Sequence, residues 1–297
     1  MKGLYNIGNT CYMNSAIQCL SHIPELRNYF LTGCHTNTLI EGCSGFDLTI
    51  EWQRLLYRLC QDKTTSIVHP IDFIKAFLTT CQKNKIQFNG FNQNDVEDFL
   101  NQFLDFIHNS ISRKIITNIS GTINTIKDQL AVDAAMSWDK FFNSNYSHII
   151  SILYSQLLCT ITCPSCKHTC INYEPLMTIS LSIPTALIYK QDSITLYDLF
   201  DSYTGEEILD TDNQWTCEAC KESVNCRKKL TFWDLSKVII IVIKKYTLTH
   251  KLNINIDYPM KLDLNKYSIN YRERDLKYDL IGSCIHSGGL GGGHYYA

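Results

Sequence analysis

The sequence GLYNIGNTCYMNSAIQCL, residues 3–20, carries the strongest signal for fold and chemistry in this chain. Its first part contains two glycines among polar residues, a composition that favours a loop. Apolar side chains then recur at Met13, Ile17 and Leu20, the i, i+4, i+7 spacing of one helix face. We therefore expect a loop that leads into a helix beginning at Cys11.

The position of Cys11 is typical of a reactive thiol. Asn9 or Thr10 can act as the N-cap of the helix, because either side-chain oxygen can accept a backbone N–H. A cysteine in the first turn faces the positive end of the helix dipole, which favours the thiolate. Asn6 lies on the loop before it and can donate its amide N–H to an oxyanion. Taken singly, the cysteine could instead be a buried structural thiol and the asparagine a turn residue.

A second candidate segment is YDLIGSCIHSGGLGGGHYYA, residues 278–297. Five glycines lie between His286 and His294, so this segment can approach a peptide backbone closely. A reactive thiolate requires an imidazole within hydrogen-bond reach, to hold the ion pair and to protonate a leaving amine. Either histidine taken alone is more simply a surface or core residue.

The third candidate segment is NQNDVEDFL, residues 92–100, which contains Gln93, Asp95 and Asp98. Carboxylates can pair with an arginine and accept backbone N–H groups, as a site for a basic peptide would require. On spacing alone, the simpler interpretation is an acidic first turn of a helix, stabilised by the helix dipole.

Two C-x2-C pairs predict a metal site. Cys163 and Cys166 form the first pair, and Cys217 and Cys220 form the second. Four thiolates satisfy tetrahedral zinc and leave no position for water, so we expect a structural rather than a catalytic ion. The alternatives are a redox C-x-x-C motif or core thiols. Other cysteines near these pairs could replace one of the ligands, namely Cys159, Cys170 and Cys226.

Composition excludes several classes of function. The 297 residues carry 27 Lys and Arg against 29 Asp and Glu, so no basic excess points to nucleic acid. The start lacks the apolar core of a signal peptide, and the longest apolar run, residues 238–243, fits a buried strand and is too short for a membrane span. We expect a soluble intracellular protein, cytoplasmic or nuclear, without membrane or nucleic-acid partners. Fourteen cysteines in that setting favour metal binding or catalysis over disulfides. The abundance of Ile, Asn, Lys and Tyr fits an AT-rich genome, such as that of a virus or a protist.

Periodicity predicts an α+β fold. Helical stripes dominate residues 1–110, and strand-like alternation follows in the second half. Strands are expected at 152–158, 178–183 and 238–243, with a short helix at 197–200. Helices first and strands later predict two halves with a cleft between them.

Residues 3–20 resemble the cysteine box of the ubiquitin-specific proteases, a papain-like family, which reads approximately G-L-x-N-x-G-N-T-C-Y-M-N-S-x-x-Q. Residues 278–297 resemble the histidine box of that family, and residues 92–100 resemble its Q-x-D-x-x-E box. The resemblance covers nearly the whole chain and implies one catalytic domain with a papain-like right-hand architecture. Its expected parts are a helical thumb at about 1–150, β fingers with a zinc ribbon at about 151–235, and a β palm at about 236–297.

The resemblance also implies a role for each candidate residue. Cys11 carries over as the nucleophile, His294 as the general base and acid, and Asn6 as the oxyanion donor. The positions that match substrate-binding residues of the family are Gln93, Asp95, Asp98 and His286. Asp98 departs from the pattern, since glutamate is commoner there, and its shorter side chain reaches differently.

The activity implied is hydrolysis of the isopeptide or peptide bond after the C-terminal Gly-Gly of ubiquitin, with ubiquitin and ubiquitinated proteins as partners. In the family, an Asp or Asn that orients the catalytic histidine lies downstream of the histidine box, whereas this sequence stops at Ala297. We therefore expect a truncated palm, or another residue that orients His294. The alternatives are a ubiquitin-binding module with weak or no activity and a general papain-like peptidase.

Overall fold

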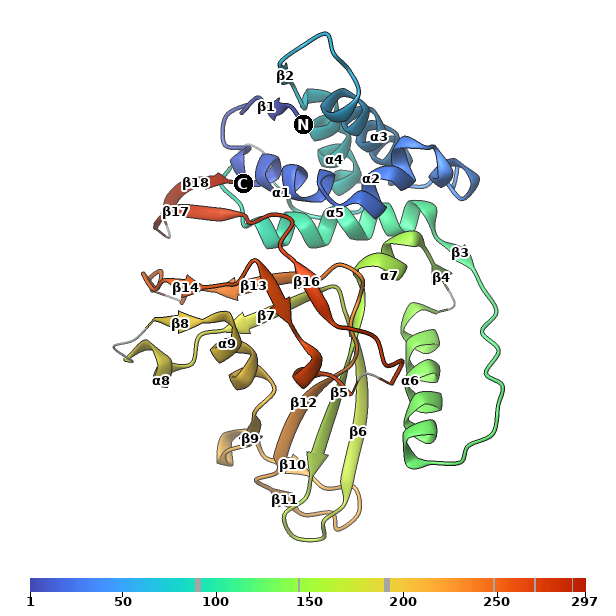
Figure 1. The fold of residues 1–297 in the computed structure, drawn as a ribbon, viewed down its shortest axis with the longest axis vertical. Coiled ribbons are helices and arrows are strands. Elements are labelled where there is room, and N and C mark those ends of the chain that lie inside the picture. Colours follow the sequence, from blue (N-terminus) through green and yellow to red (C-terminus); the bar gives the residue numbers. More distant parts are fainter. Residues whose placement is uncertain (89–91, 144, 190–192, 248, 270, 290) are drawn as a thin grey trace.

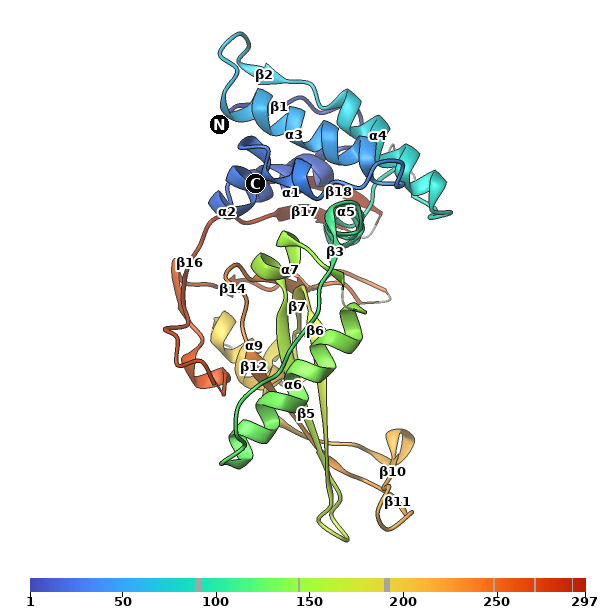
Figure 2. The ribbon, with the colours of Figure 1, turned by 90° about the vertical axis from the view of Figure 1, so that its right-hand side faces the viewer.

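The computed structural model describes residues 1–88, 92–143, 145–189, 193–247, 249–269, 271–289 and 291–297. A helical half comes first along the chain and a strand-rich half follows (Figure 1). The hairpin of β17 (Ile285–Gly289) and β18 (Gly292–Tyr296) returns to the helical half, where β18 contacts α1 (Cys11–Ser21). Both ends of the chain therefore lie at the helical half, as Figures 1 and 2 show.

The helical half confirms the stripes predicted in the first 110 residues. Besides α1 it contains α2 (Pro24–Leu31), the 3-10 turn η1 (Cys34–Asn37), α3 (Phe46–Cys60), α4 (Ile71–Lys83), α5 (Val96–Ile111) and α7 (His148–Leu153), with the parallel pair β1 (Gly3–Leu4) and β2 (Ile67–Val68) at its edge. Aromatic rings fill its core, with Trp52 at ring-centroid distances of 6.0 Å from Phe73 and 5.1 Å from Phe103. Each such buried side chain contributes about 1.5–3 kcal/mol, so this core holds the helix that carries Cys11 in place.

The helix α6 (Ile126–Phe142) was not predicted from the sequence. It begins at a capping box in which Thr125 and Asp128 bond each other's backbone N–H. Only Ala134 and Phe142 are buried, so the helix has no apolar stripe to reveal it. It lies beside β6 (Thr169–Leu176), where the Tyr173 hydroxyl donates to the Leu130 carbonyl at 2.9 Å (Figure 2).

The largest sheet is antiparallel and runs away from the helical half (Figure 1). Its strand order is β6, β5 (Ser155–Thr162), β12 (Arg227–Asp234) and β9 (Glu206–Ile208). At its far end the hairpin β10 (Trp215–Thr216) and β11 (Ser223–Val224) lies close to the turn between β5 and β6.

One predicted strand boundary is wrong. A strand was expected from residue 152, but α7 extends to Leu153 and β5 begins at Ser155. Ile149, Ile150, Ile152 and Leu153 are all buried, which is the spacing of one helix face. Most residues of 149–153 are apolar, so apolar residues at alternate positions also fit the pattern of a strand. The segment is helical in the structure, where it packs against α5.

A second, parallel pair lies nearer the helical half. β7 (Thr178–Ser182) confirms the strand expected at 178–183, and it pairs with β13 (Ile240–Lys244) in the register Ile240 to Thr178. The strand predicted at 238–243 therefore begins two residues later than expected, and its residues are half-buried rather than buried. Both strands pack on a core that includes Leu181, Phe200 and Phe232.

The remaining elements are short. They are β3 (Arg113–Lys114) with β4 (Asn145–Tyr146), α8 (Thr185–Ile188), β8 (Ile194–Thr195) with β14 (Ile256–Asp257), α9 (Leu196–Tyr203), η2 (Thr211–Asn213), β15 (Lys261–Asp263) with β16 (Lys277–Asp279), and η3 (Asn265–Tyr267). The helix α9 confirms the one predicted at 197–200, and the α+β class is confirmed. Among the described residues, no helix has both the length and the apolar character needed to cross a membrane.

Candidate active site

Cys11 is the first residue of α1, as predicted, and its side chain is buried with 8% exposed. Thr10 occupies the N-cap position but forms no capping hydrogen bond through its side chain, which corrects one expectation. Its Oγ1 turns back into the preceding loop, where it accepts the Ile7 N–H at 3.0 Å and donates to Asn6 Oδ1 at 3.0 Å. The threonine therefore shapes the loop around the cysteine instead of closing the helix end.

The same loop orients Asn6. Its Oδ1 also accepts the backbone N–H of Thr10 at 3.2 Å, so two bonds hold the oxygen within the loop. The amide nitrogen is the other branch of the same planar group, and Asn6 itself does not line the cavity of Cys11. The residue is exposed. This geometry is compatible with an N–H donor for an oxyanion formed near Cys11.

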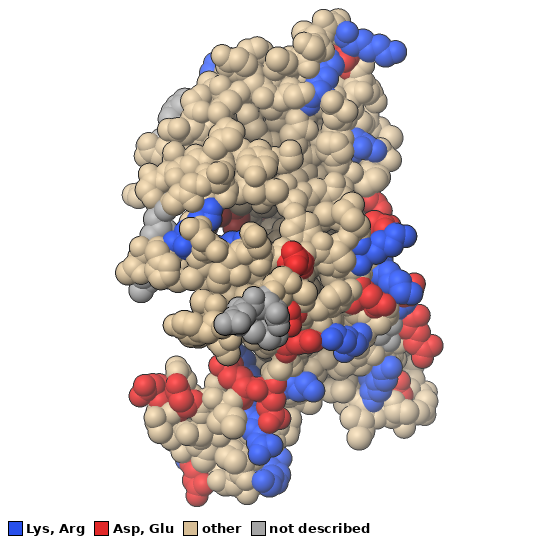
Figure 3. Space-filling view, turned by 60° about the vertical axis from the view of Figure 1, so that its left-hand side comes forward, with Lys and Arg blue, Asp and Glu red and all other residues tan. Residues whose placement is uncertain are grey.

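A cavity of about 230 Å³ joins Cys11 to both other sequence boxes. Cys11, Gln93, Asp95 and His286, all singled out from the sequence, line it together. The other lining residues are Asn9, Tyr12, Asn94, Tyr246, Gly289, Gly293 and Tyr295. Figure 3 shows the molecule hollowed between the helical half and the strand-rich half. Residues that lie far apart in the sequence, from Asn9 to Tyr295, thus line one pocket.

The segment before α5 links the β17–β18 hairpin to α1 beside this cavity. Gln93 Oε1 accepts the backbone N–H of Gly293 at 3.0 Å, and Asn94 Nδ2 donates to the Tyr12 hydroxyl at 3.1 Å. One bond reaches the β17–β18 hairpin and the other reaches α1. Gln93 therefore helps to fix the glycine-rich strand that forms one wall of the cavity.

Asp95 behaves here as a helix cap. Its Oδ1 accepts the Glu97 N–H at 2.7 Å, which is the acidic helix start that the sequence allowed as an alternative. The residue is also exposed and lines the cavity. Asp98 is exposed and does not line the cavity. Partial loss of hydration and the neighbouring Asp95 and Glu97 charges raise the pKa of Asp98.

Glu97 was missed by sequence reasoning. Its carboxylate pairs with Lys244 at the end of β13 and accepts the Ser180 hydroxyl of β7 at 3.0 Å. The partners lie 83 and 147 residues away in sequence, so no local pattern could reveal the contact. The pair joins α5 to the strands beneath it and thereby fixes the distance between the two halves.

The two candidate histidines lie on opposite faces of the β17–β18 hairpin. The register pairs His286 with Tyr295 and His294 with Ser287. Because paired residues share a face and neighbours alternate, His286 and Tyr295 face the cavity while His294 faces the other way. His294 is exposed, on the strand that contacts α1 and between two residues that line the cavity.

His286 is held by a charged neighbour. Lys251 Nζ lies 3.0 Å from its Nδ1, and the Tyr246 hydroxyl contacts the same nitrogen. Burial lowers the pKa of His286, Lys251 lowers it further, and Asp95 partly opposes this effect. An imidazole beside an ammonium group resists protonation, so His286 is poorly suited to accept a proton during a reaction.

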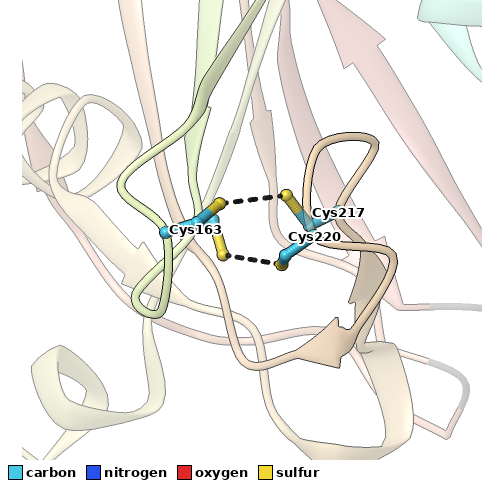
Figure 4. Close-up of side chains that lie close together, drawn as sticks. Cys163, Cys217 and Cys220 are labelled. Carbon is cyan, nitrogen blue, oxygen red and sulfur yellow. Dashed lines mark hydrogen bonds between the residues drawn. The ribbon is translucent and has the colours of Figure 1, made fainter.

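The four predicted cysteine ligands form one cluster. The sulfur atoms of Cys163, Cys166, Cys217 and Cys220 all lie within 4.8 Å of one another, and these four residues could hold a metal ion. Two cross-pairs are at 3.8 Å, Cys163 to Cys220, and 3.6 Å, Cys166 to Cys217. Figure 4 shows the two turns facing each other with their sulfurs between them. Cys159, Cys170 and Cys226 are not part of the cluster.

Both turns have the same local structure. In the first, the Lys167 N–H donates to the Cys163 carbonyl at 3.1 Å, and in the second the Lys221 N–H donates to the Cys217 carbonyl at 2.8 Å. Each lysine has a φ of 63°, a left-handed conformation that completes a tight turn. A backbone N–H from Cys166 lowers the pKa of the Cys163 thiol to about 7. The neighbouring thiols raise the pKa of Cys166 and Cys220, so the first thiolate of the cluster forms most readily at Cys163. The two turns bring together four sulfur ligands of the kind that soft divalent ions prefer.

The model of one protein family, ubiquitin carboxyl-terminal hydrolase, matches residues 2–297. The chain belongs to this family. Among its curated relatives, ubiquitin carboxyl-terminal hydrolase 2 of Bos taurus is 31% identical over 305 residues and that of Homo sapiens is 30% identical, each match covering the whole chain. Ubiquitin carboxyl-terminal hydrolase 4 of Saccharomyces cerevisiae (strain RM11-1a) is 29% identical over 99% of the chain. The chain spans 49% of the length of the first two relatives and 35% of the third.

Solved structures place this ubiquitin carboxyl-terminal hydrolase chain in a known fold. The SAGA Ubp8/Sgf11/Sus1/Sgf73 DUB module bound to ubiquitin aldehyde matches with a TM-score of 0.73, and the module bound to monoubiquitin with 0.71. Each match covers 99% of this chain and 60–61% of the solved chain, at 22% identity. The expected papain-like right-hand architecture is therefore confirmed.

Proposed function

We propose that this chain is a deubiquitinating cysteine protease, which hydrolyses the isopeptide or peptide bond after the C-terminal Gly-Gly of ubiquitin. The observation that carries the proposal is the cavity in which Cys11, at the start of a helix, meets a wall built by Gly289 and Gly293. Membership of the ubiquitin carboxyl-terminal hydrolase family and the ubiquitin bound in the solved structures support it.

The chemistry begins at Cys11. Its thiolate attacks the carbonyl carbon of the last ubiquitin glycine, and the Asn6 amide N–H stabilises the oxyanion that forms. His294 gives a proton to the departing lysine amine, which leaves a thioester on the cysteine. Water, activated by the same histidine, then hydrolyses the thioester and restores the thiol.

His294 rather than His286 is proposed as the acid and base. Lys251 disfavours the protonated form of His286, whereas His294 lies on an exposed strand face next to the helix of Cys11. Catalytic hydrogen bonds are often long before substrate binds, and they shorten in the complex. For this reaction the His294 ring must reach Cys11 when the hairpin rearranges on substrate binding.

The walls of the cavity suggest why the substrate must end in glycine. A Cβ added at Gly293 would lie 2.3 Å from the Ser287 carbonyl oxygen and 2.4 Å from His286 Nε2, so the hairpin packs against itself here with no spare space. We propose that the channel beside this wall admits an extended backbone without side chains. We propose that Gln93, Asp95, Asp98 and His286 bind the basic tail of ubiquitin, through carboxylate pairing with arginine and bonds to its backbone.

We propose zinc as the ion of the four-cysteine cluster, because tetrahedral thiolate sites with two C-x2-C turns suit it. The ion would hold the β5–β6 turn against the β10–β11 hairpin and would take no part in the reaction. We also propose that residues 1–150, 151–235 and 236–297 act as thumb, fingers and palm.

Substitution of Gly293 by alanine is expected to lower kcat/KM for ubiquitin substrates by about 100-fold, because the hairpin must shift by about 1 Å to accept the methyl group. Hydrolysis of ubiquitin carrying a fluorogenic C-terminal amide measures this change. Gly291→Ala is the matched control, since its added Cβ meets no atom within 4 Å. Equal activity in both variants would contradict the narrow channel.

The proposed function is tested by ubiquitin with a C-terminal electrophile. We expect the wild-type protein to gain the mass of one ubiquitin, and Cys11→Ala to gain none. Cys34→Ala, which removes an exposed thiol, is the control and should still be labelled. Labelling of the Cys11→Ala variant would show that Cys11 is not the nucleophile. A wild type that binds ubiquitin but is never labelled would indicate a binding module.

A further inference from the structure

A small hairpin after β13 reaches back to the cavity. Tyr246 and Lys251 form an antiparallel bridge, the Thr247 N–H donates to the His250 carbonyl at 2.9 Å, and the Leu252 N–H donates to the Lys245 carbonyl at 2.7 Å. Cross-strand partners point to the same side of a hairpin. Tyr246 and Lys251 accordingly converge on one target, Nδ1 of His286.

The ammonium group of Lys251 lies 5.7 Å from the centroid of the Tyr246 ring and forms its hydrogen bonds with β17. Besides the contact of 3.0 Å to His286 Nδ1, its Nζ donates to the His286 carbonyl at 2.7 Å and to the Gly288 carbonyl at 3.1 Å. An ammonium has three N–H donors, so these contacts match its full capacity. The lysine thereby bridges the hairpin after β13 to the strand that forms the glycine wall of the cavity.

The contact with Lys251 favours one tautomer of His286. An ammonium group has no lone pair, so a hydrogen bond with Lys251 makes Nδ1 the acceptor, whereas the Tyr246 hydroxyl at the same nitrogen fits either tautomer. In the neutral ring the proton then resides on Nε2, the nitrogen that packs against Gly293. The cavity therefore has a ring N–H donor beside its glycine wall, which suits the carbonyl groups of an extended peptide.

We propose that Lys251 is a positioning residue, which holds His286 with its proton on Nε2 and fixes β17 so that the substrate tail meets an ordered wall. The effect of Lys251 on turnover rests on the proposed function, whereas its effect on the tautomer of His286 does not. The charged and titratable groups around His286 are Lys251 and Tyr246 on the hairpin, Asp95 at the start of α5, and Tyr295 on β18. Lys251 is the cation among them, and its ammonium lowers the pKa of the ring.

The first test needs no substitution in the network itself. The ¹⁵N chemical shifts of the wild-type imidazole, assigned by their absence in His286→Gln, report which ring nitrogen carries the proton. We expect the proton on Nε2 in the neutral ring. A proton on Nδ1 would overturn the proposal outright.

Variants then isolate the lysine. In Lys251→Met we expect a mixture of tautomers and a higher ring pKa, because a positive neighbour is lost. Lys251→Arg should keep the proton on Nε2, since guanidinium also donates without accepting. Lys245→Met is the matched control: it removes the same charge from the same hairpin, but that ammonium donates to the Ile254 carbonyl at 2.7 Å. A Lys251→Met spectrum equal to that of the wild type would contradict the proposal.

Turnover provides the second readout. With the fluorogenic ubiquitin amide, kcat/KM is expected to fall about tenfold in Lys251→Met, mostly through KM, and to recover in Lys251→Arg. A protein with the expected tautomers but no hydrolysis would refute the proposed function and keep the positioning role. Unchanged kcat/KM in Lys251→Met, with the wild type active, would refute the role in substrate binding.

Discussion

Substitution of His294 by alanine is expected to lower kcat for hydrolysis of a ubiquitin C-terminal amide by about 10²–10⁴-fold, the range for loss of a general acid and base. Without an imidazole, the Cys11 thiolate loses its ion-pair partner, and the leaving amine has no proton donor. Single-turnover and steady-state kinetics at saturating substrate would measure the change. In His294→Ala, kcat for a ubiquitin C-terminal ester should fall less than kcat for the amide, because an alcohol leaves more easily than an amine and needs less protonation.

His286→Ala is the matched control, since the two histidines lie on the same hairpin and on opposite faces of it. We expect this variant to raise KM with a smaller change in kcat, because His286 lines the cavity while Lys251 suppresses its protonation. If kcat fell strongly in His286→Ala and little in His294→Ala, His286 and not His294 would be the general acid and base.

Removal of the metal is expected to unfold the far end of the fingers. A four-thiolate zinc site contributes on the order of 10 kcal/mol to the folding of its surroundings, and the second cysteine turn joins β10 and β11, which pair over two residues each. Cys217→Ser, or treatment of the wild type with a chelator, should therefore expose the turns at residues 163–168 and 217–222 to proteolysis. Metal analysis should find one zinc per wild-type chain and a large loss in the variant.

Cys170→Ser is the control for this prediction. Cys170 lies on β6, close in sequence to the first turn, but outside the four-sulfur cluster. Its replacement should leave both the zinc content and the protease protection unchanged. Equal zinc content and protection in Cys217→Ser would show that the cluster does not hold the ion.

Local patterns gave reliable predictions wherever the structure itself is local. The helix at Cys11 follows from one apolar stripe, and the two cysteine turns follow from residues within six positions of each other. Each turn is closed by a backbone bond between its own residues, so the spacing of the cysteines is sufficient to predict it. The family resemblance then indicated the reaction in which the Cys11 helix takes part and the structural role of the two cysteine turns.

Predictions failed where a second segment decides the structure. The strand expected at residue 152 is the end of α7, because α5 covers its apolar face. The expected cap bond of Thr10 is replaced by a bond to Asn6. Lys251 and Glu97 carried no signal at all, since their partners are distant in sequence.

The sequence by itself singled out the candidate nucleophile, the four cysteines that cluster and the two candidate histidines, because each is marked by its immediate neighbours. Only the tertiary structure decided which histidine faces the cavity. The pairing register of β17 against β18 places His286 on the cavity side. Successive side chains of a strand point to opposite faces, so a register shift of one residue would turn the other face of the strand to the cavity. The two strands also contact distant parts of the chain, through the bond from Gly293 to Gln93 and through Lys251, and local sequence patterns do not reveal such contacts.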